Sequence, residues 1–350
     1  MRSRTALIAG AITAFLVTVV IVFLLGDGDE EEPSVSGPVS SASPSELPPE
    51  EKARCPLTGQ APPRGVRLGR PAVALKIENS PEARPQHGLD KADLVFEELV
   101  EGGSTRFMAI YHCGSSADAG PIRSARFDDP KIARPFTRVI AYSGSNGIVD
   151  NELRKRNFVI LNELNQRGAF YRVPPGAILV HNLFARTEVL RRDPRADKVK
   201  PPRDDVFTFG DVPETAKRAR RVRLNFSGSA TIEYRWKGGA WKRYENGPFL
   251  MSNGRQIAVP NVLVQQVDVR SSRRLVDSAG NSSPKIDLKG KGKALLFRDG
   301  RVIKGTWQMK NGRPFYRTRS GKDFVFARGP IWVELVPSRK GPLKGSIAFR

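Results

Sequence analysis

The chain has 350 residues and a formal net charge of +22. Its length allows two domains of ordinary size and excludes a peptide too short to bury a core of its own. A charge this positive is typical of proteins that meet polyanions, namely nucleic acid, anionic lipid or an anionic wall polymer, and the compartment decides among them.

The first segment predicts export. Residues 6–25 form an uncharged apolar run, and a helix of about 20 residues is long enough to cross a hydrocarbon core of ~30 Å. Arg2 and Arg4 precede the run and five acidic residues follow it. By the positive-inside rule, we expect residues 1–26 to be a single-pass membrane anchor that leaves the rest of the chain extracytoplasmic. A cleavable signal peptide is the alternative. Export argues against nucleic acid as a partner.

The remaining chain predicts an α+β protein with two domains. Residues 27–52 are rich in Glu, Ser and Pro, with almost no large apolar side chain, which is typical of a disordered spacer. We expect a mixed α/β domain over residues 53–200 and a β-rich domain over residues 205–340. The boundary falls where apolar residues nearly vanish and prolines and charges accumulate, between residues 193 and 204.

Short apolar runs and turn signals predict the elements of each domain. In the first domain, residues 71–79, 107–111 and 138–142 fit strands, residues 148–156 and 183–192 fit helices, and residues 94–100 fit either. In the second, strands are expected at 231–236, 262–269, 294–298, 302–307, 315–318, 324–327 and 331–336. Dipeptides such as Asn246-Gly247 and Asn311-Gly312 predict hairpins between them.

Cys55 and Cys113 are the two cysteines of the chain. An even pair in an oxidising compartment commonly forms a disulfide, which here would hold the start of the first domain beside the strand at residues 107–111. Two separate thiols are the alternative. His112 follows that strand, and alternation would point its side chain away from Cys113.

Familiar catalytic and cofactor-binding motifs are absent from the sequence, which has no G-x-S-x-G, no Walker loop, no G-x-G-x-x-G and no H-E-x-x-H. No cofactor and no metal are therefore expected. Polar residues instead collect at strand ends and turns of the first domain, above all beside the Gly120-Pro121 turn. The candidate ligand-binding residues are Glu78, Asn79, Arg84, Gln86, His87, Arg106, Arg123, Ser124, Arg126, His181 and Asn182.

Arginine forks in one cleft suit a carboxylate or phosphate, which they bind through two parallel hydrogen bonds. The alternative is that Arg106, Arg123 and Arg126 pair internally with acidic neighbours such as Glu78 and Glu101. In the second domain, the segments 217–223 and 285–293 are basic, and Trp and Tyr residues alternate with Arg and Lys near residues 234–244. This pattern suits an anionic glycan or a phosphodiester polymer, or else a solvated basic surface over a sheet core.

Several motifs in order resemble the YerB-like family of bacterial lipoproteins, which carry a domain of unknown function, DUF3048, in N-terminal and C-terminal parts. They are PLTG at residues 56–59, NSPEARPQHGLDKADLVFE at 79–97, VEGGSTRF at 100–107, AGPIRSAR at 119–126, FRDGRVIKGTW at 297–307 and WVELVP at 332–337. The chain departs from the family in having no lipobox cysteine after the apolar run. The resemblance implies an envelope location and a two-part domain plan, and it implies no activity.

These features together favour a non-enzymatic envelope protein that binds an anionic cell-wall component or a wall-synthesis partner. The alternative is an enzyme that acts on a wall glycan or peptide through the Arg and His loops of the first domain.

Overall fold

The computed structural model describes residues 53–173, 181–277 and 280–350. The predicted anchor and spacer lie outside these residues. In the described part, no helix is both long enough and apolar enough to cross a membrane.

A twelve-stranded sheet runs through both predicted domains. Ten strands follow the order β20-β19-β18-β16-β22-β2-β3-β1-β4-β5, while β17 and β9 pair with β16 and β19 off that path. The strands are β1 (Val73–Glu78), β2 (Leu94–Leu99), β3 (Thr105–Tyr111), β4 (Val139–Ala141), β5 (Val159–Leu161), β9 (Lys217–Arg218), β16 (Asn261–Val276), β17 (Ser282–Asp287), β18 (Lys291–Arg298), β19 (Arg301–Lys310), β20 (Arg313–Thr318) and β22 (Ile331–Pro337).

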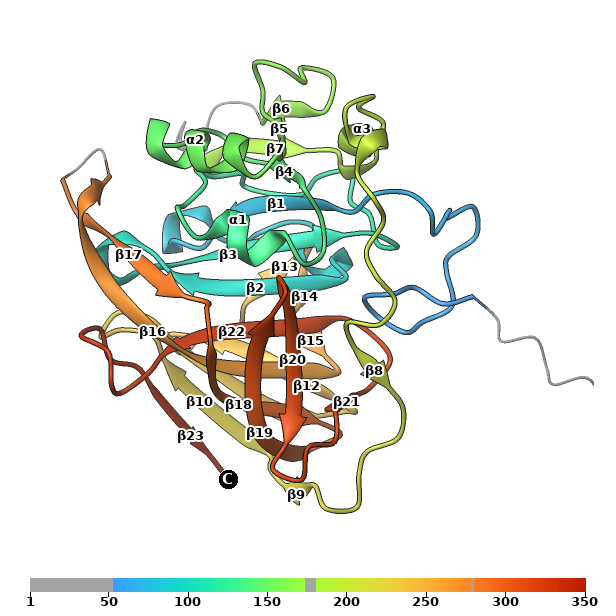
Figure 1. Cartoon of the computed structure of the whole chain (residues 1–350), viewed down its shortest axis with the longest axis vertical. Coiled ribbons are helices and arrows are strands. Elements are labelled where there is room, and N and C mark those ends of the chain that lie inside the picture. Colours follow the sequence, from blue (N-terminus) through green and yellow to red (C-terminus); the bar gives the residue numbers. More distant parts are fainter. Residues whose placement is uncertain (1–52, 174–180, 278–279) are drawn as a thin grey trace, which may run out of the picture. The chain divides into compact units, whose positions relative to one another are not determined.

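The two halves of the chain meet where β2 lies beside β22 (Figure 1). These strands pair in parallel from Leu94 opposite Ile331 to Glu97 opposite Glu334. All six residues of β2 and all seven of β22 are buried, as expected for central strands covered on both faces. The described residues accordingly form one compact unit, and the division at residues 193–204 stays a prediction.

The N-terminal half mixes strands with short helices, as predicted. The helices are α1 (Asp129–Ala133), α2 (Gly147–Lys155) and α3 (Thr187–Arg191), with short 3-10 turns η1 (Pro81–Ala83), η2 (Leu89–Lys91), η3 (Glu101–Gly103) and η5 (Ala196–Lys198). The run at residues 94–100, which fitted either structure, is strand β2.

The helix expected over residues 183–192 is wrong at its start. Residues Leu183–Ala185 form strand β7, which pairs with β6 (Phe170–Arg172), and helix α3 begins only at Thr187. The backbone N–H of Ile122 donates to the carbonyl of Leu183 at 2.7 Å, and that of Ala119 donates to Ala185 at 3.0 Å. Extended backbone is thus required here to hold the loop at residues 119–122.

The C-terminal half is built largely of hairpins, as the turn dipeptides predicted. Asn246, Asp299 and Asn311 each have φ near +50° and are each followed by a glycine with positive φ. Two successive residues in this left-handed region match the turn that joins twisted antiparallel strands in a two-residue loop. All seven predicted strands are present, with β21 (Val325–Phe326) shorter than expected.

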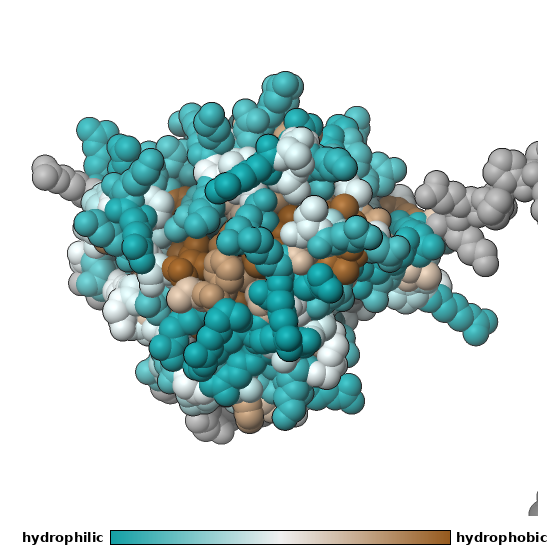
Figure 2. Space-filling model, turned by 90° about the horizontal axis from the view of Figure 1, so that it is seen from below, coloured by the Kyte–Doolittle hydropathy of each residue, from teal (hydrophilic) through white to brown (hydrophobic). Residues whose placement is uncertain are grey.

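A second, five-stranded sheet packs over the large one and encloses the core of the C-terminal half. Its order is β15 (Ala258–Val259), β12 (Ala240–Glu245), β11 (Thr231–Lys237), β10 (Arg221–Asn225) and β23 (Ser346–Phe349). Two-stranded pairs are formed by β13 (Met251–Ser252) with β14 (Arg255–Gln256) and by β8 (Thr208–Phe209) with β21. The ring of Trp241 on β12 lies 5.8 Å from that of Phe297 on β18, which brings the two sheets into contact. Seen from below, hydrophilic residues cover most of the molecule and flank a strip of hydrophobic residues (Figure 2).

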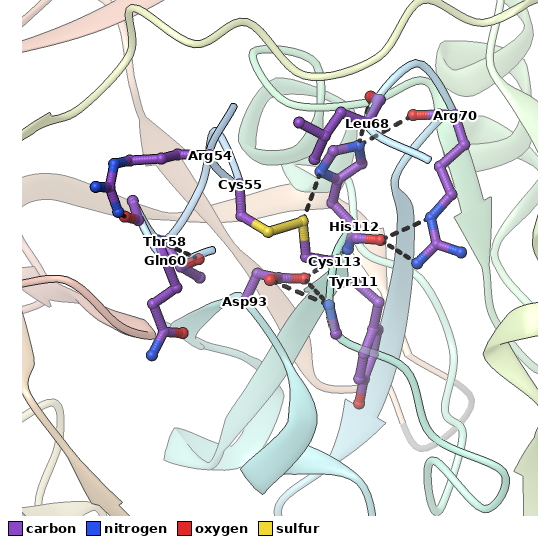
Figure 3. The surroundings of a disulfide bond; sticks show 12 residues. Arg54, Cys55, Thr58, Gln60, Leu68, Arg70, Asp93, Tyr111, His112 and Cys113 are labelled. Atoms are coloured by element: carbon purple, nitrogen blue, oxygen red, sulfur yellow. Dashed lines mark hydrogen bonds between the residues drawn. A yellow bond between two sulfur atoms is a disulfide. The ribbon is translucent and has the colours of Figure 1, made fainter. Parts of the chain in front are cut away.

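The predicted disulfide is present. Cys55 and Cys113 are bonded, with their Cα atoms 6.1 Å apart (Figure 3). The expectation that His112 points away from Cys113 is wrong: its Nδ1 lies 3.7 Å from the Cys113 sulfur. Strand β3 ends at Tyr111, so strict alternation of side chains no longer applies at His112. Asp93 stabilises this bend by accepting the backbone N–H groups of His112 and Gly114.

Candidate functional site

A cleft of about 500 Å³ lies beside the loop at residues 120–126. We call it the arginine cleft, because Arg106, Arg123 and Arg126 line it. The start of α2 and the end of the β16–β17 hairpin contribute further lining residues, among them Asn146, Val149, Leu275 and Val276. The cleft therefore combines guanidinium groups with an aliphatic surface.

Backbone hydrogen bonds hold the arginine-bearing loop in place. The N–H of Arg123 donates to the carbonyl of Lys76 at 2.9 Å, and the N–H of Glu78 donates to Pro121 at 2.9 Å. A Cβ atom on Gly120 would lie 2.7 Å from the ring of Phe184 and 2.9 Å from the Leu183 carbonyl oxygen. Only glycine fits such a close approach, so the loop is fixed against β1 and β7 as a rigid support for its arginines.

Two of the three arginines share one buried carboxylate. Glu78 accepts from Arg123 Nε at 2.5 Å and lies 3.5 Å from Arg106 Nε. Burial raises the pKa of Glu78, but Arg106, Arg123 and the N–H of Asn79 outweigh burial and bring it below its ordinary value. Glu78 is therefore ionised at neutral pH, and the internal pairing that we considered for these arginines is present.

The third arginine pairs with a second carboxylate. Arg126 donates through Nε to Glu101 at 2.7 Å and through Nη1 to the Ser124 and Ala125 carbonyls at 3.1 Å. Glu101 also accepts the hydroxyl of Ser283 on β17. Burial raises the pKa of Glu101, but Arg126 and Ser283 more than offset it and leave the pKa below its usual range. Arg126 is thus fully engaged and mainly fixes the cleft wall.

Arg123 has unused donors. Its contact to Glu78 is through Nε, and among the described residues neither terminal nitrogen of Arg123 has a protein acceptor. The side chain is 28 % exposed, whereas those of Arg106 and Arg126 are 9 % and 17 % exposed. Arg106, Arg123 and Arg126 share the carboxylates of Glu78 and Glu101, and a third carboxylate, Asp277, also lines the cleft; the terminal nitrogens of Arg123 form an open fork. Such a fork is suited to bind a carboxylate or phosphate through two hydrogen bonds.

The structure divides the predicted site residues into three groups. Arg106, Arg123, Ser124 and Arg126 line the cleft. Behind them, Glu78, Asn79, Arg84 and Gln86 form one hydrogen-bonded network, in which Gln86 donates to the Glu78 carbonyl at 3.1 Å and Arg84 to the Asn79 carbonyl at 2.9 Å. His87, His181 and Asn182 are not among the residues that line the cleft.

The two histidines have different surroundings. His87 Nδ1 lies 2.8 Å from Asp118, which Asn253 also contacts at 2.8 Å. His181 has a buried Nδ1 with no hydrogen-bond partner in the described part of the chain. Asn182 accepts from Arg172 at 2.8 Å. No group of three His, Cys, Asp or Glu side chains among the described residues could hold a metal ion.

Sequence reasoning missed the residues that close the cleft from the C-terminal half. Leu275, Val276 and Ser283 belong to the long hairpin of β16 and β17, which extends alongside the N-terminal half (Figure 1). Strand β16 was expected to end at residue 269 and continues to Val276. The segment after residue 269 is polar and basic, so no apolar alternation indicated a strand.

A buried charge network joins this region to the second sheet. Arg243 on β12 is fully buried and lies 2.7 Å from Glu97, 3.1 Å from Glu245 and 3.2 Å from Glu334. Asn79 donates to Glu245 at 2.8 Å and so connects the network with the cleft. Arg84 also pairs with Glu245 at 2.6 Å, so two guanidinium groups face three carboxylates and cannot neutralise all of them. Burial raises the pKa of Glu97 to about 8 despite Arg243, and Glu97 contacts Glu334 directly.

This network predicts a pH dependence of stability. The folded protein holds a proton on Glu97 up to about pH 8, whereas the unfolded chain releases it near the ordinary value of 4.5. Because the folded state binds the extra proton, the free energy of unfolding should fall as the pH rises between these values. Urea unfolding at pH 5, 6.5 and 8 measures this slope, and Glu97→Gln should flatten it. The exposed Glu214→Gln is the control, and an equal slope in Glu97→Gln and the parent contradicts the assignment.

Comparisons with known proteins place the chain in a family. Residues 57–200 match the family model described as the N-terminal domain of a protein of unknown function, DUF3048, and residues 222–333 match the corresponding C-terminal domain. The chain is 28% identical over 296 residues to the Bacillus subtilis protein described as "Putative lipoprotein YerB", covering 82% of this chain and 87% of that one. The crystal structure of YerB from Bacillus subtilis is similar with a TM-score of 0.69 and 27% identity, over 85% of this chain and all of that chain. The chain therefore belongs to the family of proteins that carry the N- and C-terminal DUF3048 domains, as a distant relative of YerB.

Proposed function

We propose that this chain is an extracytoplasmic envelope protein that binds an anionic cell-wall component in the arginine cleft. The observation that carries the proposal is the guanidinium of Arg123, a residue that lines the cleft and whose terminal nitrogens have no acceptor among the described residues. Extracytoplasmic location is supported by the similarity to a protein described as a lipoprotein and by the bonded cysteine pair.

The anchor in this proposal is the apolar segment at residues 6–25. No cysteine follows that segment at the distance that lipid attachment would need, since Cys55 is the first cysteine of the chain and is bonded to Cys113. A protein anchor thus takes the place of a lipid anchor. The globular part lies outside the membrane in this arrangement, where wall components are accessible.

The residues that line the cleft limit the chemical groups that a ligand would carry. Arg123 offers two parallel donors for a carboxylate or phosphate oxygen pair. Val149, Leu275 and Val276 add aliphatic side chains to the lining; Val276 is 44% exposed, whereas Val149 and Leu275 are buried. A ligand with an anionic group next to a short apolar portion, such as the carboxyl end of a wall peptide, would satisfy both surfaces.

The enzyme alternative gains no support from the geometry. His87 and His181, the histidines of the loops that the enzyme alternative would use, do not line the cleft. Arg106 and Arg126 form ion pairs with Glu78 and Glu101. These ion-paired side chains form the wall of a binding site. We therefore build the proposal on binding alone.

Titration of the full chain in neutral detergent with soluble wall fragments released by a muramidase tests this proposal. Calorimetry should show binding that weakens at high salt, because the contact is a partly exposed charge pair. Arg123→Ala should lower the affinity about tenfold or more, the effect of losing a hydrogen bond to a charged group. Arg123→Lys keeps the charge but loses the fork, and should recover only part of the affinity.

The matched control is Arg134→Ala, which removes an exposed arginine outside the cleft. Melting temperatures of all variants separate loss of binding from loss of fold. Unchanged affinity in Arg123→Ala, or binding that does not respond to salt, would contradict the proposal.

A further inference from the structure

A second concave site lies in the C-terminal half, far along the sequence from the arginine cleft. It has a volume of about 700 Å³ and we call it the basic groove, because Lys289, Lys291, Lys293, Arg339 and Lys340 line it. We propose that the basic groove binds a linear polyanion, a polymer with repeated phosphodiester or carboxylate groups. This goes beyond the proposed function, because it adds a site that shares no lining residue with the arginine cleft.

Trp307 also lines the groove and makes a close contact within the large sheet. The indole Nε1 of Trp307 on β19 donates to the carbonyl of Gln266 on β16 at 2.8 Å, across strand β18. A Cβ atom on Gly292 would lie 2.5 Å from that nitrogen and 2.7 Å from that oxygen. Glycine at this position therefore lets the indole cross β18 on the face opposite to the side chains of Lys291 and Lys293, because adjacent side chains of a strand alternate.

The cations of the groove lack internal partners. Among the described residues, none of the five forms an ion pair, in contrast to the arginines of the cleft. The two carboxylates of the groove are engaged locally: Asp268 accepts the hydroxyl of Ser338, and Asp287 accepts the backbone N–H of Lys289 at 2.9 Å. Five cations around two acidic groups repel one another, and an anionic ligand would relieve this repulsion.

The arrangement of the cations favours a chain with repeated charges over a single anion. Lys291 and Lys293 are exposed and point to the same face of β18, and residues two apart on a strand are about 7 Å apart. Lys289 precedes them in the turn after β17. Arg339 and Lys340 follow β22 and complete the lining of the groove. The site is also concave, which suits a polymer chain better than the flat surface of a membrane.

The test uses the full chain in neutral detergent with two defined polymers, poly(glycerol phosphate) and polygalacturonate. The wild-type chain should bind at least one of them, with an affinity that falls steeply with salt. Lys291→Glu with Lys293→Glu should lower that affinity about tenfold or more and reduce its salt dependence, because two phosphate or carboxylate contacts are lost. Binding of one polymer alone would assign the anion as phosphodiester or carboxylate.

The matched control is Lys310→Glu with Lys322→Glu, which makes the same change of net charge at exposed lysines outside the groove. This control should bind nearly as the wild type does. Arg123→Ala should also bind the polymers normally, so that failure of the arginine cleft and failure of the basic groove are distinguishable.

Two results would overturn the proposal. The first is an equal loss of affinity in the two double variants, or the absence of binding to either polymer by the wild-type chain. In the second, neither polymer binds while vesicles of phosphatidylglycerol bind in preference to phosphatidylcholine in a manner that needs Lys291 and Lys293, which would assign the groove to a membrane surface.

Discussion

Replacement of Arg243 by alanine should lower the free energy of unfolding by roughly 3–5 kcal/mol, the usual cost of removing one partner from a buried ion pair. Arg243 and its partners Glu97 and Glu334 are fully buried, and Glu245 nearly so. Without the guanidinium of Arg243, Glu97 and Glu334 must be protonated or remain buried without a counter-charge, while Glu245 keeps its contact to Arg84 at 2.6 Å. The loss should therefore grow with pH.

The size of this effect follows from where the network lies. Glu97 is on β2, Glu334 on β22 and Arg243 on β12, so one guanidinium joins both halves of the large sheet to the second sheet. The hydroxyl of Tyr234 on β11 contacts Glu334 and accepts from Arg243 at 2.8 Å. Alanine would leave a cavity there in addition to unpaired charge.

Urea unfolding followed by circular dichroism measures the change, with Arg255→Ala on the exposed strand β14 as the control. Arg243→Lys keeps a positive charge without the fork, and should fall between the parent and Arg243→Ala. A loss below about 1 kcal/mol in Arg243→Ala would be the size typical of an exposed ion pair. It would mean that the buried carboxylates find other partners.

Local sequence patterns predicted much of the fold because their causes are local. The turn at Asn311-Gly312 needs two successive residues with positive φ, and that dipeptide tolerates them. The buried run of β22 has apolar residues at nearly every position. Hairpins, strands and the family resemblance could therefore be derived before any coordinates.

Pairings between distant segments could not be derived in this way. The parallel contact of β2 with β22 joins residues more than two hundred positions apart, and no short pattern encodes it. Leu183 was expected in a helix because Leu183–Arg192 is rich in helix formers, but its carbonyl is needed by Ile122. Tertiary hydrogen bonds overrode the local preference there.

The sequence indicated which residue types form the candidate site, but only some of the named residues lie at the cleft. Arg123 and Arg126 were expected at a cleft and line one. His87, His181 and Asn182 were grouped with them because they too lie at turns, and they are not among the residues that line the cleft. Which arginine keeps free donors depends on side-chain contacts to Glu78 and Glu101, and sequence spacing left that question open.

Reduction of the Cys55–Cys113 bond should lower the free energy of unfolding by about 4 kcal/mol, the value that the chain-entropy model gives for a closed loop of this length. The bonded residues are 58 positions apart in the sequence. Cys55 belongs to an entry segment with no regular strand or helix. Two backbone hydrogen bonds involve this segment: the N–H of Gly59 donates to the carbonyl of Cys55 at 2.8 Å, and the N–H of Gly329 donates to the carbonyl of Thr58 at 2.8 Å. Once the bond is cut, the hydrogen bond from Gly329 to Thr58 and the packing of the buried Leu57 must hold the segment.

The bond also supports the strand that leads to the arginine cleft. Cys113 follows β3, which carries Arg106, and Asp93 fixes the adjoining bend through the N–H groups of His112 and Gly114 (Figure 3). Thermal unfolding of the parent with and without reductant, and of Cys55→Ser with Cys113→Ser, measures the loss. The double variant should melt at a lower temperature and should no longer respond to reductant. Equal melting temperatures would show that packing of Leu57 and its neighbours suffices to hold the entry segment, because Leu57 is completely buried.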